Sequence, residues 1–167
     1  MAKSSTYIVT HDTLAGSGVR FLNYLIDSLA ILLALLFLFV IYFAFVAEIS
    51  PEEYDLSLEV TGNDVVINIL SIVLLAVYYF LFESSIGRTP GKYVTGTVVV
   101  DRNGNIPSAT QVLQRTLSRF IPFEFLSFLG RDARGWHDNI SDTYVVYVKK
   151  LEDSKSTFTN MNELGSL

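Results

Sequence analysis

Two long runs of apolar residues constrain the fold of this chain more than any other feature. Residues 21–47 contain one charged side chain, Asp27, and residues 65–82 contain none. A bilayer core of about 30 Å requires about 20 apolar residues in a helix, so the first run can cross with tilt and the second is a minimal span. We therefore predict an all-α membrane protein with two transmembrane helices, over about residues 21–47 and 65–82.

The overall composition agrees with a membrane protein. Half of the 167 residues are hydrophobic and 17% are charged, against roughly 25% charged in a soluble domain. This balance argues against an ordinary soluble enzyme, a disordered chain and a nucleic-acid-binding protein. The chain has no cysteine, which excludes disulfides and cysteine-ligated metal sites.

The basic residues predict the orientation in the membrane. All twelve Lys and Arg lie before residue 21 or after residue 87, whereas residues 48–64 contain six acidic residues and no base. The positive-inside rule then places both termini in the cytoplasm and the acidic loop outside. Residues 1–20 lack the apolar core of a cleavable signal peptide. We expect a multi-pass protein of the cell (plasma or inner) membrane.

A third apolar region, residues 108–129, is too short and too polar for an obvious span. Ser108 suits a helix N-cap, and Pro122 should end or kink the helix that follows. Apolar residues then recur at helical spacing at Val112, Leu113, Leu117, Phe120 and Ile121. We interpret this region as an amphipathic helix in the cytoplasmic interface, and a third span is the alternative.

The remaining regular structure is predicted to be β. Residues 94–101 and 143–148 are rich in β-branched residues, and the first run stops at an Asn-Gly turn signal. Lone strands cannot lie in lipid, so we expect a small, β-hairpin-like sheet on the cytoplasmic side. Residues 1–150 would form one membrane domain, and the polar, aperiodic residues 151–167 a mobile cytoplasmic tail.

Asp27 is the polar residue that a bilayer makes most costly, at roughly 2.5–3.5 kcal/mol in a helix centre. Arg20 is its expected partner, although seven residues separate the two. Two interpretations follow: a structural ion pair, or a group that binds a transported cation or proton. Asn23 and Asn68 are amides in or near the spans, and such groups usually form hydrogen bonds between helices.

Two further segments carry polar residues without an enzymatic motif. Residues 87–92 (GRTPGK) lack the spacing and the final Ser or Thr of a phosphate-binding loop, so we expect close backbone packing and contact with anionic headgroups. His137 and Asp138 are adjacent, but two distant histidines make a metal site improbable, and Asp138 suits a turn or cap. We therefore expect that the protein is not an enzyme and binds no cofactor.

Three segments in order resemble the RDD family of small membrane proteins, which is named for one arginine and two aspartates. They are residues 19–27 (VRFLNYLID), 87–92 and 137–146 (HDNISDTYVV). The resemblance assigns the arginine to Arg20, the first aspartate to Asp27 and the second to Asp138, with Asp101 and Asp142 as rivals. The supporting positions are Asn23, Asn68, Gly87, Thr89, Gly91, Lys92, Gly96, Arg115 and His137.

The resemblance implies an integral membrane protein and suggests transport, with some members proposed as cation/proton antiporters. We therefore expect a transporter or permeation component for a small ligand or cation. Two helices from one chain cannot enclose a pathway, so we expect a homo-oligomer or a membrane protein partner. The alternative is a non-catalytic adaptor that docks a partner or lipids at the cytoplasmic face.

Overall fold

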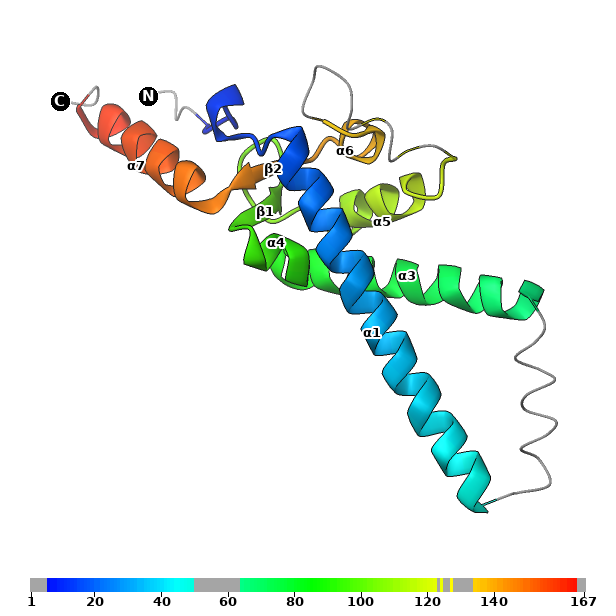
Figure 1. The fold of residues 1–167 in the computed structure, drawn as a ribbon. Coiled ribbons are helices and arrows are strands. Elements are labelled where there is room, and N and C mark those ends of the chain that lie inside the picture. The colour runs from blue at the N-terminus through cyan, green and yellow to red at the C-terminus, as the bar shows by residue number, and fades with distance from the viewer. Residues whose placement is uncertain (1–5, 50–63, 123, 125–126, 128–133, 165–167) are drawn as a thin grey trace.

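The computed structural model describes residues 6–49, 64–122, 124, 127 and 134–164. Two long helices cross, and the shorter elements gather around the N-terminal part of the first helix (Figure 1). The predicted acidic loop, residues 48–64, lies almost wholly outside the described residues, as do several positions of the third apolar region.

Helix α1 (Ser17–Ile49) confirms the first apolar helix and extends it at both ends. Its buried residues are Arg20, Asn23 and Asp27, whose spacings of three and four residues place them on one face. Large apolar residues around them are exposed, for example Phe21 at 59% and Leu25 at 54%. This arrangement is the reverse of a soluble amphipathic helix and suits a helix with lipid on its apolar sides.

Helix α3 (Asp64–Ile86) confirms the second apolar helix. Both α1 and α3 are long and apolar enough to cross a membrane. Gly87 ends α3 with a φ of +66°, and its N–H donates to the Glu83 carbonyl at 3.1 Å. A Cβ at Gly87 would lie 2.9 Å from the Val99 carbonyl oxygen, so glycine also allows the chain to pack against the sheet.

The sheet has two antiparallel strands, β1 (Thr97–Val100) and β2 (Tyr144–Tyr147). The predicted pairing of the two β-branched runs is confirmed, with Val98 opposite Val146. The strands pair as in a hairpin, but helices α5 and α6 lie between them in the chain. The sheet valines form the buried apolar clusters: Val98, Val100, Val146 and Leu151 in one, and Ala15, Val99 and Val145 in the other.

Helix α5 (Ala109–Ser118) begins where predicted but is only ten residues long. Ser108 caps it, since its hydroxyl accepts from the Gln111 N–H and the Gln111 side chain accepts in return. The prediction of one helix over residues 108–129 is wrong, because the chain leaves helical geometry before Pro122. The alternative of a third span falls partly on residues outside the described ranges.

The faces of α5 are also reversed relative to a soluble helix. Val112, Arg115, Thr116 and Ser118 are buried, whereas Leu113 is 48% exposed and Leu117 58% exposed. The mainly polar face therefore packs on the protein, and large apolar side chains point outward. That surface suits contact with lipid acyl chains.

The C-terminal segment is helical, and the prediction of an irregular tail over residues 151–167 is wrong as far as Leu164. Helix α7 (Val148–Leu164) follows β2 directly, and Leu151 is buried in the sheet cluster. Tyr7 stacks edge-on against Phe158 and donates to the Ser154 hydroxyl at 3.0 Å. The N-terminal segment thus contacts α7, and the polar composition of residues 151–167 did not indicate these contacts.

Candidate functional site

Six charged side chains lie together where the N-terminal part of α1 meets the C-terminal end of α3. We call Arg20, Glu83, Lys92, Arg115, Arg119 and Asp138 the charge network. They come from α1, α3, α4 (Pro90–Val94), α5 and its C-cap, and α6 (Trp136–Ile140). The network therefore joins both long helices to the elements around the sheet.

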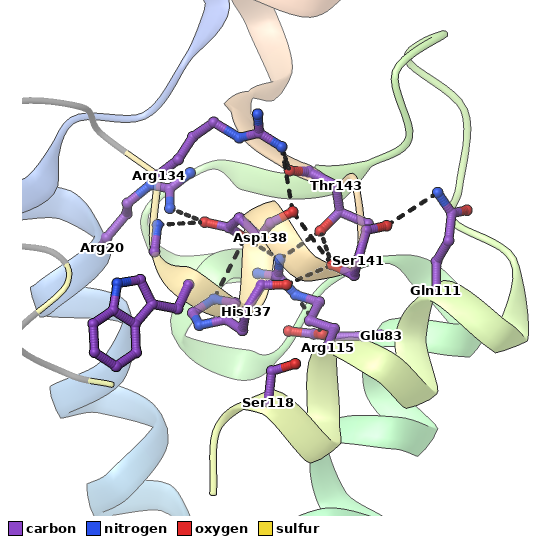
Figure 2. Close-up of polar contacts among 12 residues, drawn as sticks. Arg20, Glu83, Gln111, Arg115, Ser118, Arg134, His137, Asp138, Ser141 and Thr143 are labelled. Atoms are coloured by element: carbon purple, nitrogen blue, oxygen red, sulfur yellow. Dashed lines mark hydrogen bonds and ion pairs between the residues drawn. The ribbon is translucent and has the colours of Figure 1, made fainter. Parts of the chain in front are cut away.

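Asp138 forms one centre of the charge network (Figure 2). Its two carboxylate oxygens pair with Arg20 and Arg115, and it also accepts from the Gly135 N–H at 3.1 Å. Burial favours a higher pKa for Asp138, but the charges of Arg115 and Arg20 outweigh burial and hold the pKa well below its usual value. Asp138 is therefore an ionised, fully buried bridge, and its predicted capping role is only part of its contacts.

Glu83 forms the other centre. Its carboxylate accepts from Arg119 at 2.7 Å and Arg115 at 2.9 Å, and it contacts Lys92 Nζ at 3.1 Å. Glu83 is completely buried, so these three cations replace the water that the carboxylate loses. Arg115 contacts both Glu83 and Asp138 and thereby links the two centres.

Lys92 faces this network. It is 4% exposed, and its ammonium group also lies 3.3 Å from the Thr89 hydroxyl. Burial lowers the pKa of Lys92, and the neighbouring Glu83 carboxylate partly offsets this effect. Lys92 is thus buried among protein groups, and contact of residues 87–92 with headgroups stays a prediction.

Asp27 pairs with neutral donors, and the prediction that Arg20 is its partner is wrong. Its carboxylate accepts from the Thr89 hydroxyl at 2.6 Å, the Gly91 N–H at 2.7 Å and the Tyr78 hydroxyl at 3.2 Å. Arg20 instead reaches Asp138 and the Ala15 carbonyl. Asp27 therefore fastens the Gly-rich segment after α3 to α1.

The contact with Asp27 explains why residue 91 is glycine. A Cβ there would lie 2.5 Å from the Asn23 carbonyl oxygen and 2.8 Å from the Asp27 carboxylate. The predicted close backbone packing of this segment is confirmed. Neighbouring Thr95 donates to the Asn23 side chain at 2.5 Å, and Asn23 donates to Thr97 at 3.1 Å.

Two supporting positions lie apart from these contacts. Asn68 is exposed on α3. Gly96 is an exposed turn residue with a φ of +66°, and its carbonyl accepts from the Val148 N–H at 3.0 Å. The sequence prediction grouped both with the site, but the structure gives Gly96 a backbone role between β1 and α7 and leaves Asn68 on the surface.

His137 lies beside the charge network and contacts Glu124 through Nδ1 at 2.5 Å. Burial is the main reason that its pKa falls to about 4, so the imidazole is neutral at pH 7. Within the described ranges, no group of three or more His, Cys, Asp and Glu side chains could hold a metal ion.

Sequence reasoning did not identify Glu83, Arg119, Glu124 or Thr143 as site residues. Thr143 accepts from Arg115 at 2.7 Å, and the Arg119 guanidinium lies 3.8 Å from the centroid of the Tyr79 ring. The sequence could have marked Glu83 as a site residue, because an acid at the end of an apolar span requires a partner. The other contacts depend on residues distant in sequence, and no local pattern marked them.

A cavity of about 420 Å³ adjoins the charge network. It is lined by α1, α3, α4, α5, the residues that follow α5, α6 and β2. Its charged lining residues are Arg20, Asp27, Lys92, Arg115, Arg119 and Glu124, and its apolar ones include Leu75, Phe120 and Ile121. A space of this size accommodates a small molecule or the polar part of a larger one.

The structure also distinguishes the three rivals for the second signature aspartate. Asp101 accepts from the N–H groups of Asn103 and Asn105 in a turn, and the Asp142 side chain is 61% exposed. Asp138 alone among these three contacts Arg20. The geometry therefore agrees with the assignment of Asp138.

Comparison with known protein families gives a match over the part of the chain that contains the three signature residues. A family model described as the RDD family matches residues 14–142, which contain Arg20, Asp27 and Asp138. No curated protein and no solved structure matches the chain. The matched range covers most of the sequence and the whole charge network, and the chain belongs to the RDD family.

Proposed function

We propose that this RDD-family protein is an integral membrane protein of the cell membrane with both termini in the cytoplasm. We propose further that it acts, as a homo-oligomer, as a transporter or permeation component for a small charged ligand. The observation that carries the proposal is the charged cavity of about 420 Å³, to whose lining both long apolar helices contribute. Charged groups are costly in a membrane and usually mark a ligand pathway or a buried ion pair.

Asp27 and Arg119 connect the cavity to this function. Asp27 is 1% exposed and lines the cavity together with Arg119. A ligand in the cavity would therefore meet both an acidic group on α1 and a basic group at the C-cap of α5. The proposed role is non-enzymatic, since these groups would bind and pass a solute without making or breaking a covalent bond.

A second candidate is a membrane adaptor, and α7 favours it. This helix extends away from the crossing of α1 and α3 (Figure 1). Met161 and Leu164 near its end are 60% and 73% exposed. An exposed helix with apolar residues could dock a protein partner or anionic lipids at the cytoplasmic face.

Cysteine labelling tests the proposed orientation. The chain has no native cysteine, so Ser57→Cys and Ser156→Cys each introduce a single reactive thiol. Only the Ser57→Cys protein should react with an impermeant maleimide in intact cells, and both should react after permeabilisation. Reaction of the Ser156→Cys protein alone would invert the orientation.

Flux through reconstituted vesicles separates the two candidate functions. Wild-type protein should move a small charged solute, tested with alkali cations, protons and inorganic anions in turn. Asp27→Asn should lower that flux, and Leu36→Ala, far along α1, should not. A folded, correctly oriented wild-type protein that moves none of these solutes would support the adaptor.

A further inference from the structure

Two arginines that line the cavity each keep one hydrogen-bond donor group unused. Arg20 Nη2 and Arg119 Nη1 are buried, and neither has a partner among the described residues. Leaving such a charged N–H group without a partner costs free energy, and buried donors in proteins are rarely left so. Both side chains line the cavity, so a ligand there would meet the residues that carry these unpartnered donors.

The neighbouring carboxylates are already engaged. Asp138 and Glu83 bind the other nitrogens of the same two guanidinium groups, at Arg20 Nη1 and Arg119 Nη2. The other acids that line the cavity, Asp27 and Glu124, accept hydrogen bonds from neutral donors and from His137. The unpartnered arginine N–H groups can therefore donate to a ligand that carries its own oxygen acceptors.

The charge balance limits the charge of such a ligand. Arg20, Lys92, Arg115 and Arg119 offset Asp27, Glu83, Glu124 and Asp138, and His137 is neutral at pH 7. A singly charged oxyanion therefore suits the cavity better than a doubly charged one. Guanidinium groups are planar donors that match the oxygens of phosphate and carboxylate.

The rest of the lining is amphiphilic. Tyr24, Phe120 and Ile121 line the cavity and are themselves 49%, 37% and 38% exposed. Apolar residues at the edge of a charged cavity suit a ligand whose charged group is attached to a hydrophobic body. A phosphodiester in a lipid headgroup has this form and carries one negative charge on the phosphate.

We propose that the cavity binds a singly charged phosphodiester through Arg20 Nη2 and Arg119 Nη1. This inference specifies the class of ligand that the cavity binds. It rests on the proposed function only in assuming that the protein uses this cavity to bind its ligand. The same phosphate chemistry could reach the site as part of a membrane lipid or as a soluble ester, and the experiment below distinguishes the two sources.

The experiment measures thermal unfolding of purified protein in a neutral detergent. Three additions are compared: phosphatidylglycerol, the soluble phosphodiester glycerophosphoglycerol, and a neutral diacylglycerol. A ligand that binds only the folded state raises Tm in proportion to its saturation. Phosphatidylglycerol alone raising Tm would identify a lipid headgroup, and both phosphodiesters raising it would identify a soluble ester as sufficient.

Two conservative variants are designed to remove the free donors while leaving each carboxylate a cationic partner. Arg119→Lys retains a cation for Glu83, and Arg20→Lys retains one for Asp138. Each should weaken the apparent affinity for the phosphodiester about tenfold, the effect of losing one charge-assisted hydrogen bond. Arg134→Lys is the matched control, because Arg134 also has a buried unpartnered nitrogen within the described part of the chain but does not line the cavity.

The proposal fails if neither phosphodiester raises Tm, if diacylglycerol is as effective, or if the Arg119→Lys and Arg20→Lys proteins respond like the Arg134→Lys control. Binding is measured here without flux. A protein that binds the phosphodiester but moves no solute would refute the transport proposal alone, and one that moves solute without binding would refute this inference alone.

Discussion

The two ends of α1 belong to one continuous helix but contact very different surroundings. Near its N-terminus, Arg20, Asn23 and Asp27 are buried against other elements. Further along, Leu36, Phe37 and Val40 are 56%, 65% and 57% exposed. Both ends are helical and mostly apolar, so secondary structure and hydropathy do not distinguish them.

The two ends of α1 differ because lipid can replace the protein contacts of an apolar side chain but not those of a buried charged one. Acyl chains solvate a leucine as well as another leucine does, so apolar contacts give little preference for one arrangement of helices. A buried carboxylate or guanidinium group has no such substitute and must meet a specific partner. The polar end of α1 therefore positions the fold, and the apolar end only has to stay in the membrane.

The largest effect should come from breaking the charge network at Asp138. Asp138→Asn would leave Arg20 and Arg115 without their shared anion, which should lower the free energy of unfolding by about 3–5 kcal/mol. Denaturant unfolding in detergent micelles measures this loss. Control Asp142→Asn changes an exposed acid nearby and should have little effect.

Double variants sharpen the same prediction. Arg20→Gln and Asp138→Asn share one interaction, so their combined loss should be smaller than the sum of the single losses. Within the described part of the chain, Arg20 and Asp27 share no hydrogen-bond partner, so Arg20→Gln and Asp27→Asn should be closer to additive. Stronger coupling of Arg20 with Asp27 than with Asp138 would contradict the described pairing.

The next effect should be a loss of stability in mild acid through His137. Its pKa is about 4 in the folded protein and about 6.5 in an unfolded chain, so the unfolded state binds the extra proton between these values. Stability should therefore fall as pH falls from 6.5 to 4, by up to about 3 kcal/mol.

His137→Gln removes the titrating group and should flatten that part of the stability profile. Asp138 contributes in a lower window, because its lowered pKa adds stability above its unfolded value of about 3.8 that is lost at more acid pH. Unfolding midpoints measured from pH 7 to pH 4 test the prediction. An unchanged slope in the His137→Gln protein would assign the acid sensitivity elsewhere.

A smaller effect is expected where the backbone approaches Asp27. In Gly91→Ala, the new Cβ would collide with the Asn23 carbonyl and the Asp27 carboxylate, which should cost about 1–3 kcal/mol. Gly18→Ala is the control, because nothing lies within 4 Å of a Cβ there. Gly18→Ala should leave the unfolding midpoint unchanged or raise it, since alanine favours the helix.

The smallest effect is expected at the apolar end. Leu36→Ala should change the free energy of unfolding by no more than about 0.5 kcal/mol, because lipid or detergent replaces the lost contacts. The same unfolding assay measures it. A loss as large as that of Asp138→Asn would show that this part of α1 packs against protein, as in an oligomer. It would contradict the stated difference between the polar and the apolar end of α1.

The sequence predicted some site residues but not their pairing. Arg20, Asp27 and Asp138 were recognised, yet Arg20 was paired with Asp27, seven residues away, and the structure pairs it with Asp138 across 118 positions. Glu83 was not among the predicted site residues, although it has three cationic partners. Local spacing limits which side chains can meet within a helix, but it contains no information on a partner from another element.

The sequence by itself determined the elements whose causes are local. Apolar composition specified α1 and α3, β-branched residues specified β1 and β2, and Ser108 marked the start of α5. Only the tertiary structure decided which buried charges meet, that α5 turns its polar face inward, and that the C-terminal segment folds as α7 against the N-terminal segment. The reason is physical: helix and strand propensities act between neighbours in the chain, whereas a buried charge is stabilised by whichever partner the fold brings within a few ångströms.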